Sequence, residues 1–322
     1  MKTLASEIIK GRRLTSHDDL SFFQTADLTA LCEGADEIRR ALCGTKADLC
    51  TIINGRSGRC SEDCRFCAQS ASHHSPCETY SFLSSRSILE NCGRVHACGV
   101  DRFSIVTAGR SLKGADLESA VSAYADMHQK YPGMLLCASH GLLSGDDLKR
   151  LKEAGVTTYH CNLETSERFF PQICTTHTYA DKLETINLAK AAGLKVCSGG
   201  ILGMGEEFED RILLALKLSE LEISSIPVNF LIPIPGTPLA HVPPMKQPDI
   251  LRAAALFRYL NPTAFVRIAA GRNYFPGGGQ ELFQAGANAA ITGDMLTTTG
   301  SNTQQDRSML ENIGFRLKQQ QN

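Results

Sequence analysis

The sequence predicts an α/β protein with a (β/α)8 barrel of the TIM type and an N-terminal helical extension. Eight short runs rich in strand-forming residues alternate with amphipathic helical runs. Several helical runs close on a glycine suited to a left-handed cap, at Gly99, Gly155, Gly193 and Gly286. No linker or change in composition separates a second domain. This unbroken alternation favours one closed parallel barrel over a doubly wound sheet.

The elements follow one another along the chain in a regular order. A helical stretch over residues 16–44 comes first. Eight predicted strands follow, at residues 50–54, 102–107, 134–138, 157–163, 195–199, 226–232, 264–269 and 288–292. The intervening runs, such as 178–192, carry apolar residues at helical spacing. We therefore expect a helical extension over residues 1–44 and the barrel over residues 45–322.

Composition and charge limit the possible partners. The chain has 322 residues, of which 43% are hydrophobic, and a formal net charge of -1, so it offers no field that attracts nucleic acid or an acidic membrane surface. No apolar stretch has the length of a signal peptide core or a membrane span. A cytoplasmic location is the expectation. In a reducing cytosol, the 13 cysteines indicate metal ligation more than disulfides.

Three cysteines lie close together in the loop after the first predicted strand. Cys60, Cys64 and Cys67 stand in the segment GRCSEDCRFCAQS. A structural zinc site takes four ligands, and the next cysteine, Cys77, has no partner at pair spacing. Three thiolates suit a four-iron cluster whose fourth iron stays open for a ligand. The alternative is three incidental loop cysteines.

Polar and cysteine residues gather at the predicted carboxyl ends of the strands, where barrel enzymes hold their active sites. We expect these side chains to point into one central cavity. They are Ser104, Thr107, Cys137, His160, Cys161, Asn162, Glu164, Cys197, Asn229 and Arg267. Cys50, at the start of the first strand, is expected to point to the opposite end of the barrel.

The Cys-x3-Cys-x2-Cys loop resembles that of the radical S-adenosylmethionine (SAM) superfamily. Four further motifs are similar to the biotin synthase family: NLETS at 162–166, KVCSGGILGMGE at 195–206, PVNFLIPIPGTPL at 227–239 and VRIAAGR at 266–272. The resemblance implies that a reduced 4Fe-4S cluster splits SAM into methionine and a 5'-deoxyadenosyl radical. This radical removes hydrogen atoms from dethiobiotin, and sulfur insertion then gives biotin. Such cofactor chemistry needs no side-chain acid or base.

The resemblance also implies the ligand contacts. SAM is expected to contact Phe66, Thr107, Asn162, Glu164, Ile201 and Ile232, with Gly199 and Gly200 allowing close approach. Asn162 and Glu164 have an alternative role as a strand-end turn or helix cap. For dethiobiotin, the matching residues are His160, Asn229 and Thr298, because an amide pairs well with a ureido group.

A second, auxiliary iron–sulfur cluster is implied, with a departure from the family pattern. The family holds a two-iron cluster through three cysteines and one arginine. Cys137, Cys197 and Arg267 match three of these positions, but the fourth is Ser104, and a hydroxyl is a poor iron ligand. Our hypothesis is that Cys137, Cys161 and Cys197 bind a four-iron cluster whose remaining iron takes Arg267 or an exogenous sulfide.

Other readings of these residues stay open. Cys161 is alternatively a small buried apolar residue, and Arg267 a structural charge. Cys77 and Cys92 are reserve ligands, and Cys174 is expected only to pack. We expect an electron donor such as flavodoxin or ferredoxin, possible homodimers and anaerobic activity. The alternative functions are a related hydrogenase maturase or methylornithine-type mutase, or a non-catalytic iron–sulfur or zinc scaffold.

Overall fold

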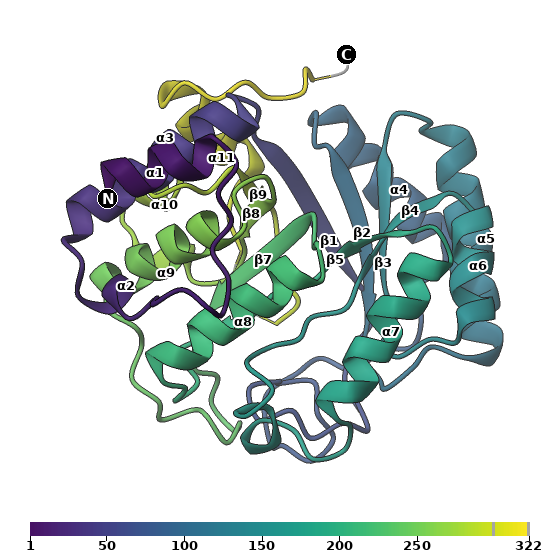
Figure 1. Ribbon diagram of the computed structural model, residues 1–322. Helices are drawn as coiled ribbons and strands as arrows, with labels where there is room; N and C mark the ends of the chain where they lie inside the picture. The colour runs from purple at the N-terminus through teal and green to yellow at the C-terminus, as the bar shows by residue number, and fades with distance from the viewer. Residues whose placement is uncertain (298–299, 321–322) are drawn as a thin grey trace.

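The computed structural model, which describes residues 1–297 and 300–320, has one closed parallel barrel (Figure 1). Its strands are β1 (Asp48–Arg56), β2 (Arg102–Thr107), β3 (Leu135–Ser139), β4 (Val156–His160), β5 (Lys195–Cys197), β6 (Gly200–Leu202), β7 (Ser225–Phe230), β8 (Phe265–Ile268) and β9 (Ala289–Ile291). They follow the order β5-β4-β3-β2-β1-β9-β8-β7-β6, and pairing of β5 with β7 closes the ring. The predicted (β/α)8 fold is confirmed.

The fifth barrel position is divided between two short strands. β5 and β6 are separated by Ser198 and Gly199, and both pair with β7. A Cβ atom at Gly199 would collide with the carbonyl of Pro227, and one at Gly200 with the carbonyl of Glu164. These glycines therefore allow close packing of neighbouring backbone, where we had expected close approach of a ligand.

Helices surround the barrel (Figure 1). They are α1 (Lys2–Ile9), α2 (Phe22–Thr25), α3 (Leu28–Cys43), α4 (Ser85–Ala97), α5 (Gly114–Lys130), α6 (Gly145–Glu153), α7 (Tyr179–Ala191), α8 (Phe208–Glu220), α9 (Gln247–Leu260), α10 (Gln280–Gln284) and α11 (Thr303–Asn312), with short 3-10 helices η1 (Phe170–Gln172) and η2 (Arg272–Tyr274). Among the described residues, no helix combines the length and apolar character needed to span a bilayer.

The N-terminal helices share the core of the barrel. α1 packs on α3, and α3 packs on α9 (Figure 1). Phe23, Leu31 and Phe257 are fully buried in the same apolar cluster as the barrel strands. The domain boundary at residue 44 stays a prediction.

Arg258 of α9 is a buried cation that joins several segments, and we expect its loss to destabilise the fold. Its guanidinium donates hydrogen bonds of 2.8 Å to the carbonyls of Gly286 and Ala264 and to Oδ1 of Asn288. Burial lowers the pKa of Arg258 to about 10. Arg258→Met leaves these three acceptors buried without a hydrogen-bond donor. We therefore expect the free energy of unfolding to fall by about 3 to 5 kcal/mol in denaturant titrations.

An exposed arginine provides the control for this prediction. Arg86 on α4 is exposed, with one ion pair to Glu90 at 3.0 Å, so Arg86→Met should change stability by less than about 0.5 kcal/mol. Equal losses in the two variants would contradict a special role for the Arg258 hydrogen bonds.

Candidate active site

A cavity of about 340 Å³ opens at the carboxyl ends of the barrel strands. Most of the predicted site residues line it, namely Phe66, Cys67, Ser104, Cys137, His160, Asn162, Glu164, Cys197, Ile201, Asn229, Ile232 and Arg267. Four predicted residues do not line it, namely Cys60, Cys64, Thr107 and Cys161. Thr298 lies outside the described residues.

Cys161 does not face the cavity, contrary to our expectation. His160 and Asn162 both line the cavity, and side chains alternate along an extended chain, so the residue between them points the other way. The backbone there is still paired, because the Cys161 N–H donates to the Cys197 carbonyl at 3.0 Å. Cys161 instead packs in the apolar core, 5% exposed. Cys137, Cys161 and Cys197 therefore do not present three thiols to one cavity.

Cys50 faces the cavity, and the expectation that it points to the opposite end is wrong. β1 begins at Asp48, two residues before the predicted start, so Cys50 is its third residue. Cys50 and Ile52 share one face of the strand and both line the cavity. The neighbouring Cys50 thiol lowers the pKa of Cys137, helped by the charges of Arg102 and Arg267 and opposed by burial. The structure thus joins Cys50 to Cys137, with Cys197 on the same cavity wall.

A buried carboxylate holds two arginines beside these thiols. Asp48 Oδ1 accepts from Arg267 Nη2 at 2.5 Å and from Arg102 Nε at 2.8 Å. Burial acts to lower the pKa of Arg267, but the charge of Asp48, together with Cys50 and Cys197, outweighs burial and raises this pKa. Two cations with one carboxylate leave a net positive charge next to the thiols. Burial still raises the pKa of Cys197, so the positive charge favours its thiolate only against the cost of desolvation. The same positive charge suits an anionic iron–sulfur cluster.

The three-thiol loop reaches the cavity through Phe66 and Cys67. The Cys60 N–H donates to the Gln69 carbonyl at 2.9 Å, and the Cys67 N–H donates to the Cys64 carbonyl at 2.9 Å, which folds the loop compactly. Within the described chain, the three loop sulfurs are not all within 4.8 Å of one another. A cluster that binds each thiolate through a different iron does not need such crowding, so the donor set fits a 4Fe-4S cluster.

Asn162 and Glu164 form a rigid wall of the cavity. The Asn162 side chain accepts from the Gly199 N–H at 3.0 Å and donates to Glu164 Oε2 at 3.3 Å. Glu164 has a φ of 69°, a conformation that costs energy for a residue other than glycine. Backbone bonds hold it there, from its N–H to Gly199 and from the Ile201 N–H to its carbonyl. These residues brace a strand-end turn and also line the cavity.

The comparisons with known proteins identify the family. Residues 56–218 match the radical SAM superfamily, and residues 227–316 match the Biotin and Thiamin Synthesis associated domain. The chain is 58% identical over 317 residues to the biotin synthase of Clostridium beijerinckii, covering 98% of this chain and 100% of that protein. The chain belongs to the biotin synthase family. The biotin synthase of Alkaliphilus metalliredigens is 55% identical, with 98% of this chain and 99% of that protein covered.

Solved structures share the fold at much lower identity. Methylornithine synthase has a TM-score of 0.82 at 20% identity, with 98% of each chain covered. HydG, a maturase of the FeFe-hydrogenase, has a TM-score of 0.81 at 16% identity, with 98% of this chain and 75% of that chain covered. These matches support the barrel, whereas membership of the biotin synthase family rests on the sequence relatives.

Two residues that the biotin synthase resemblance assigns to dethiobiotin lie on the cavity wall. Burial, with the charges of Lys182 and Arg267, lowers the pKa of His160 to about 4, so the ring is neutral at pH 7. Asn229 Nδ2 donates to the Gly200 carbonyl at 3.1 Å, and its Oδ1 accepts from the Ala270 N–H at 3.2 Å. One amide hydrogen and one lone pair of Asn229 stay available for a ligand.

Thr107 and Lys182 show where our site prediction for this member of the biotin synthase family differs from the structure. Thr107 is buried behind the cavity, and its hydroxyl lies 3.1 Å from His140 Nδ1. Lys182 of α7 is a cation that we did not predict, close enough to shift the pKa of Glu164 and Cys161. A lysine in a solvent-facing helix pattern gives no sequence signal of such a role. For Cys50, in contrast, the alternation of side chains along the strand could have predicted that it faces the cavity with Ile52.

Proposed function

We propose that this chain converts dethiobiotin to biotin by radical SAM sulfur insertion. Membership of the biotin synthase family supports the reaction. The observation that carries the proposal is that one thiol of the three-thiol loop, Cys67, lines the same cavity as Cys50, Cys137 and Cys197. A radical source and a sulfur source need such a common space.

The bound cofactors supply the reactive species, and the chain positions them. When bound, the loop cluster with SAM supplies a 5'-deoxyadenosyl radical, and an auxiliary iron–sulfur cluster supplies the sulfur atom. Glu164 and Asn162 offer a carboxylate and an amide to ribose hydroxyls from a braced backbone. Phe66, Ile201 and Ile232 line the cavity as apolar residues that exclude water.

Asn229 and His160 bind dethiobiotin through hydrogen bonds and transfer no proton. The free donor and acceptor of Asn229 match the ureido ring of dethiobiotin, and neutral His160 adds a further hydrogen-bonding group. Aliphatic C–H bonds carry no acidic proton, so a neutral histidine suits a binding role better than a catalytic base.

For the auxiliary cluster we propose Cys50, Cys137 and Cys197 as the thiolate ligands. Cys50 takes the role that our sequence hypothesis gave to Cys161, because Cys50 lines the cavity with Cys137 and lowers the pKa of that thiol. Ser104 also lines the cavity, but its hydroxyl is a poor ligand for iron. Because Asp48 keeps Arg267 cationic, we propose that an exogenous sulfide occupies the remaining iron of a four-iron cluster.

Anaerobic reconstitution with iron and sulfide tests the function. The reconstituted chain, reduced by dithionite or flavodoxin and given SAM and dethiobiotin, should form biotin, as measured by mass spectrometry. Two four-iron clusters predict about eight irons per chain, whereas a two-iron auxiliary cluster predicts about six. The proposal would be contradicted if the rate of SAM cleavage were the same with and without dethiobiotin and no biotin formed. Electron donor, homodimer and cytoplasmic location stay predictions.

Lys182→Met is expected to weaken SAM binding in a pH-dependent way. Burial raises the pKa of Glu164, and the charge of Lys182 opposes this rise. In the wild type, SAM affinity should fall as the pH drops through the pKa of Glu164. Without the lysine, the pKa of Glu164 rises further, so the midpoint of this fall moves to higher pH. We expect a loss of about tenfold near neutral pH in equilibrium binding assays. Lys195→Met, at an exposed position of β5, serves as control.

A further inference from the structure

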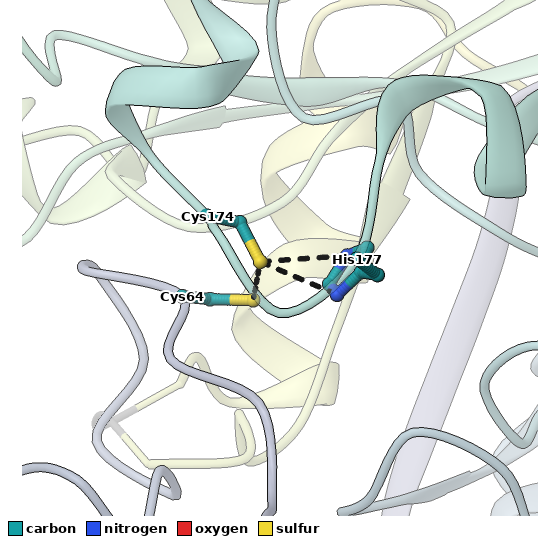
Figure 2. Close-up of side chains that lie close together, drawn as sticks. All are labelled: Cys64, Cys174 and His177. Carbon is teal, nitrogen blue, oxygen red and sulfur yellow. Dashed lines mark hydrogen bonds between the residues drawn. The ribbon is translucent and has the colours of Figure 1, made fainter.

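A second group of metal-binding side chains lies outside the cavity. Cys64, Cys174 and His177 bring their ligand atoms within 4.8 Å of one another (Figure 2). Cys64 belongs to the three-thiol loop, whereas Cys174 and His177 lie in the segment between η1 and α7. The fold therefore joins two segments that are far apart in the sequence. The proposed reaction uses neither Cys174 nor His177.

The distances suit a single tetrahedral ion. The Sγ atoms of Cys64 and Cys174 are 3.7 Å apart, and Cys174 Sγ lies 3.8 Å from His177 Nε2 (Figure 2). Metal–sulfur bonds of about 2.3 Å and metal–nitrogen bonds of about 2.0 Å give tetrahedral edges of about 3.8 Å and 3.5 Å. Small movements are therefore enough for all three atoms to bind one ion.

Two carboxylates contact this group. Glu62 Oε2 lies 2.6 Å from His177 Nδ1, the ring nitrogen that also lies 3.2 Å from Cys174 Sγ. Metal binding through Nε2 keeps the contact between Nδ1 and Glu62, which orients the ring. Asp63 Oδ1 lies 3.2 Å from Cys174 Sγ and accepts from the Thr175 N–H at 2.9 Å, so it holds the Cys174 side chain from outside the group of three ligand atoms. Cys174 and His177 are only 4% and 7% exposed. A buried histidine oriented by a carboxylate, beside two thiols, is the arrangement that protein metal sites use.

We propose that Cys64, Cys174 and His177 form a binding site for one divalent metal ion, ferrous iron or zinc, in the cluster-free chain. A water molecule takes the fourth position, as in metal sites with three protein ligands. Binding displaces the two thiol protons, so the two thiolates balance the charge of the ion. Cys64 cannot bind this ion and the loop cluster together, so the two occupancies exclude each other. Ferrous iron bound at this site would lie next to the three-thiol loop, where the cluster has to be assembled. Zinc bound at this site would instead occupy Cys64, one of the three thiols that the cluster needs.

Anaerobic titration of the reduced, cluster-free chain with Co²⁺ tests the site. We expect one Co²⁺ per chain, with the visible absorption of a tetrahedral ion and sulfur-to-cobalt charge transfer. Cys174→Ser and His177→Gln should each weaken binding at least about tenfold, and Glu62→Gln should weaken it about tenfold through the histidine. Competition with Zn²⁺ and Fe²⁺ ranks the two metals.

The rival explanation is an ion bound by the loop thiols alone. Cys60→Ser separates the two, because it removes a loop thiol that the proposed site does not use. The proposal predicts Co²⁺ binding of wild-type affinity in Cys60→Ser and in the control Cys77→Ser. Loss of binding in Cys60→Ser, or wild-type binding in Cys174→Ser and His177→Gln, would overturn the proposal.

Two measurements guard against misfolding and test the exclusion. Circular dichroism and Tm of the metal-free variants should match the wild type, and Cys174→Asp, which restores a ligand, should recover part of the affinity with weaker charge transfer. Iron and sulfide should release the bound Co²⁺ as the loop cluster assembles. Co²⁺ that stays bound beside a complete loop cluster would show that Cys64 is not its ligand and would refute the site.

Discussion

Cys50→Ser is expected to separate SAM cleavage from biotin formation. The substitution keeps the size of the side chain but replaces a soft thiolate by a hard hydroxyl in the auxiliary ligand set. We expect biotin formation to fall at least about a hundredfold, whereas 5'-deoxyadenosine formation continues, because the loop thiols are intact. Iron counts should fall by the content of the auxiliary cluster.

Cys161→Ser is the matched control for this result. Its side chain packs outside the cavity, so we expect a fully loaded auxiliary cluster and activity within a few fold of the wild type. Mössbauer spectra of both variants distinguish the outcomes. A lost auxiliary cluster in Cys161→Ser, with an intact one in Cys50→Ser, would restore Cys161 as the ligand that the sequence suggested.

Cys67→Ser is expected to abolish both SAM cleavage and biotin formation. Cys67 lines the cavity mouth, and a cluster held by only three thiolates does not tolerate the loss of one. We expect 5'-deoxyadenosine to fall at least about a thousandfold, with about four irons fewer per chain.

Cys77→Ser tests whether any thiol of this segment has the same effect. The Cys77 thiol lies 3.6 Å from Ser57 Oγ and does not line the cavity. We expect near wild-type SAM cleavage and iron content from this variant. SAM cleavage that survives in Cys67→Ser but disappears in Cys77→Ser would show that the loop cluster uses Cys77.

The barrel could be predicted because its signal is local and repeated. Each predicted strand overlaps an observed one, since short strand-forming runs between amphipathic helices have few other solutions. The break at Ser198 and Gly199 was not predicted. It depends on how closely Pro227 of β7 approaches Gly199, which is a tertiary contact without a local signature.

The site was harder to predict because its details depend on which way each side chain faces. Our prediction sent both His160 and Cys161 into the cavity, whereas adjacent side chains of an extended chain point to opposite sides. A start of β1 placed two residues late gave the wrong end of the barrel for Cys50. The matched motifs correctly indicated which segments line the cavity. They did not show which residue replaces the cysteine that the family has at Ser104, because that depends on which thiol lies nearby in space.

The division of the fifth barrel position has a consequence for the spacing of the two reagents. On the proposed assignment, Cys197 before the break holds the sulfur donor, and Ile201 after it contacts SAM. Four residue steps of extended chain span at most about 13 Å. The short covalent segment between Cys197 and Ile201 thus limits the distance between the SAM site and the sulfur-donating cluster. Chain length sets this limit, and side-chain packing does not. An insertion between these two residues would change this separation without replacing any ligand residue.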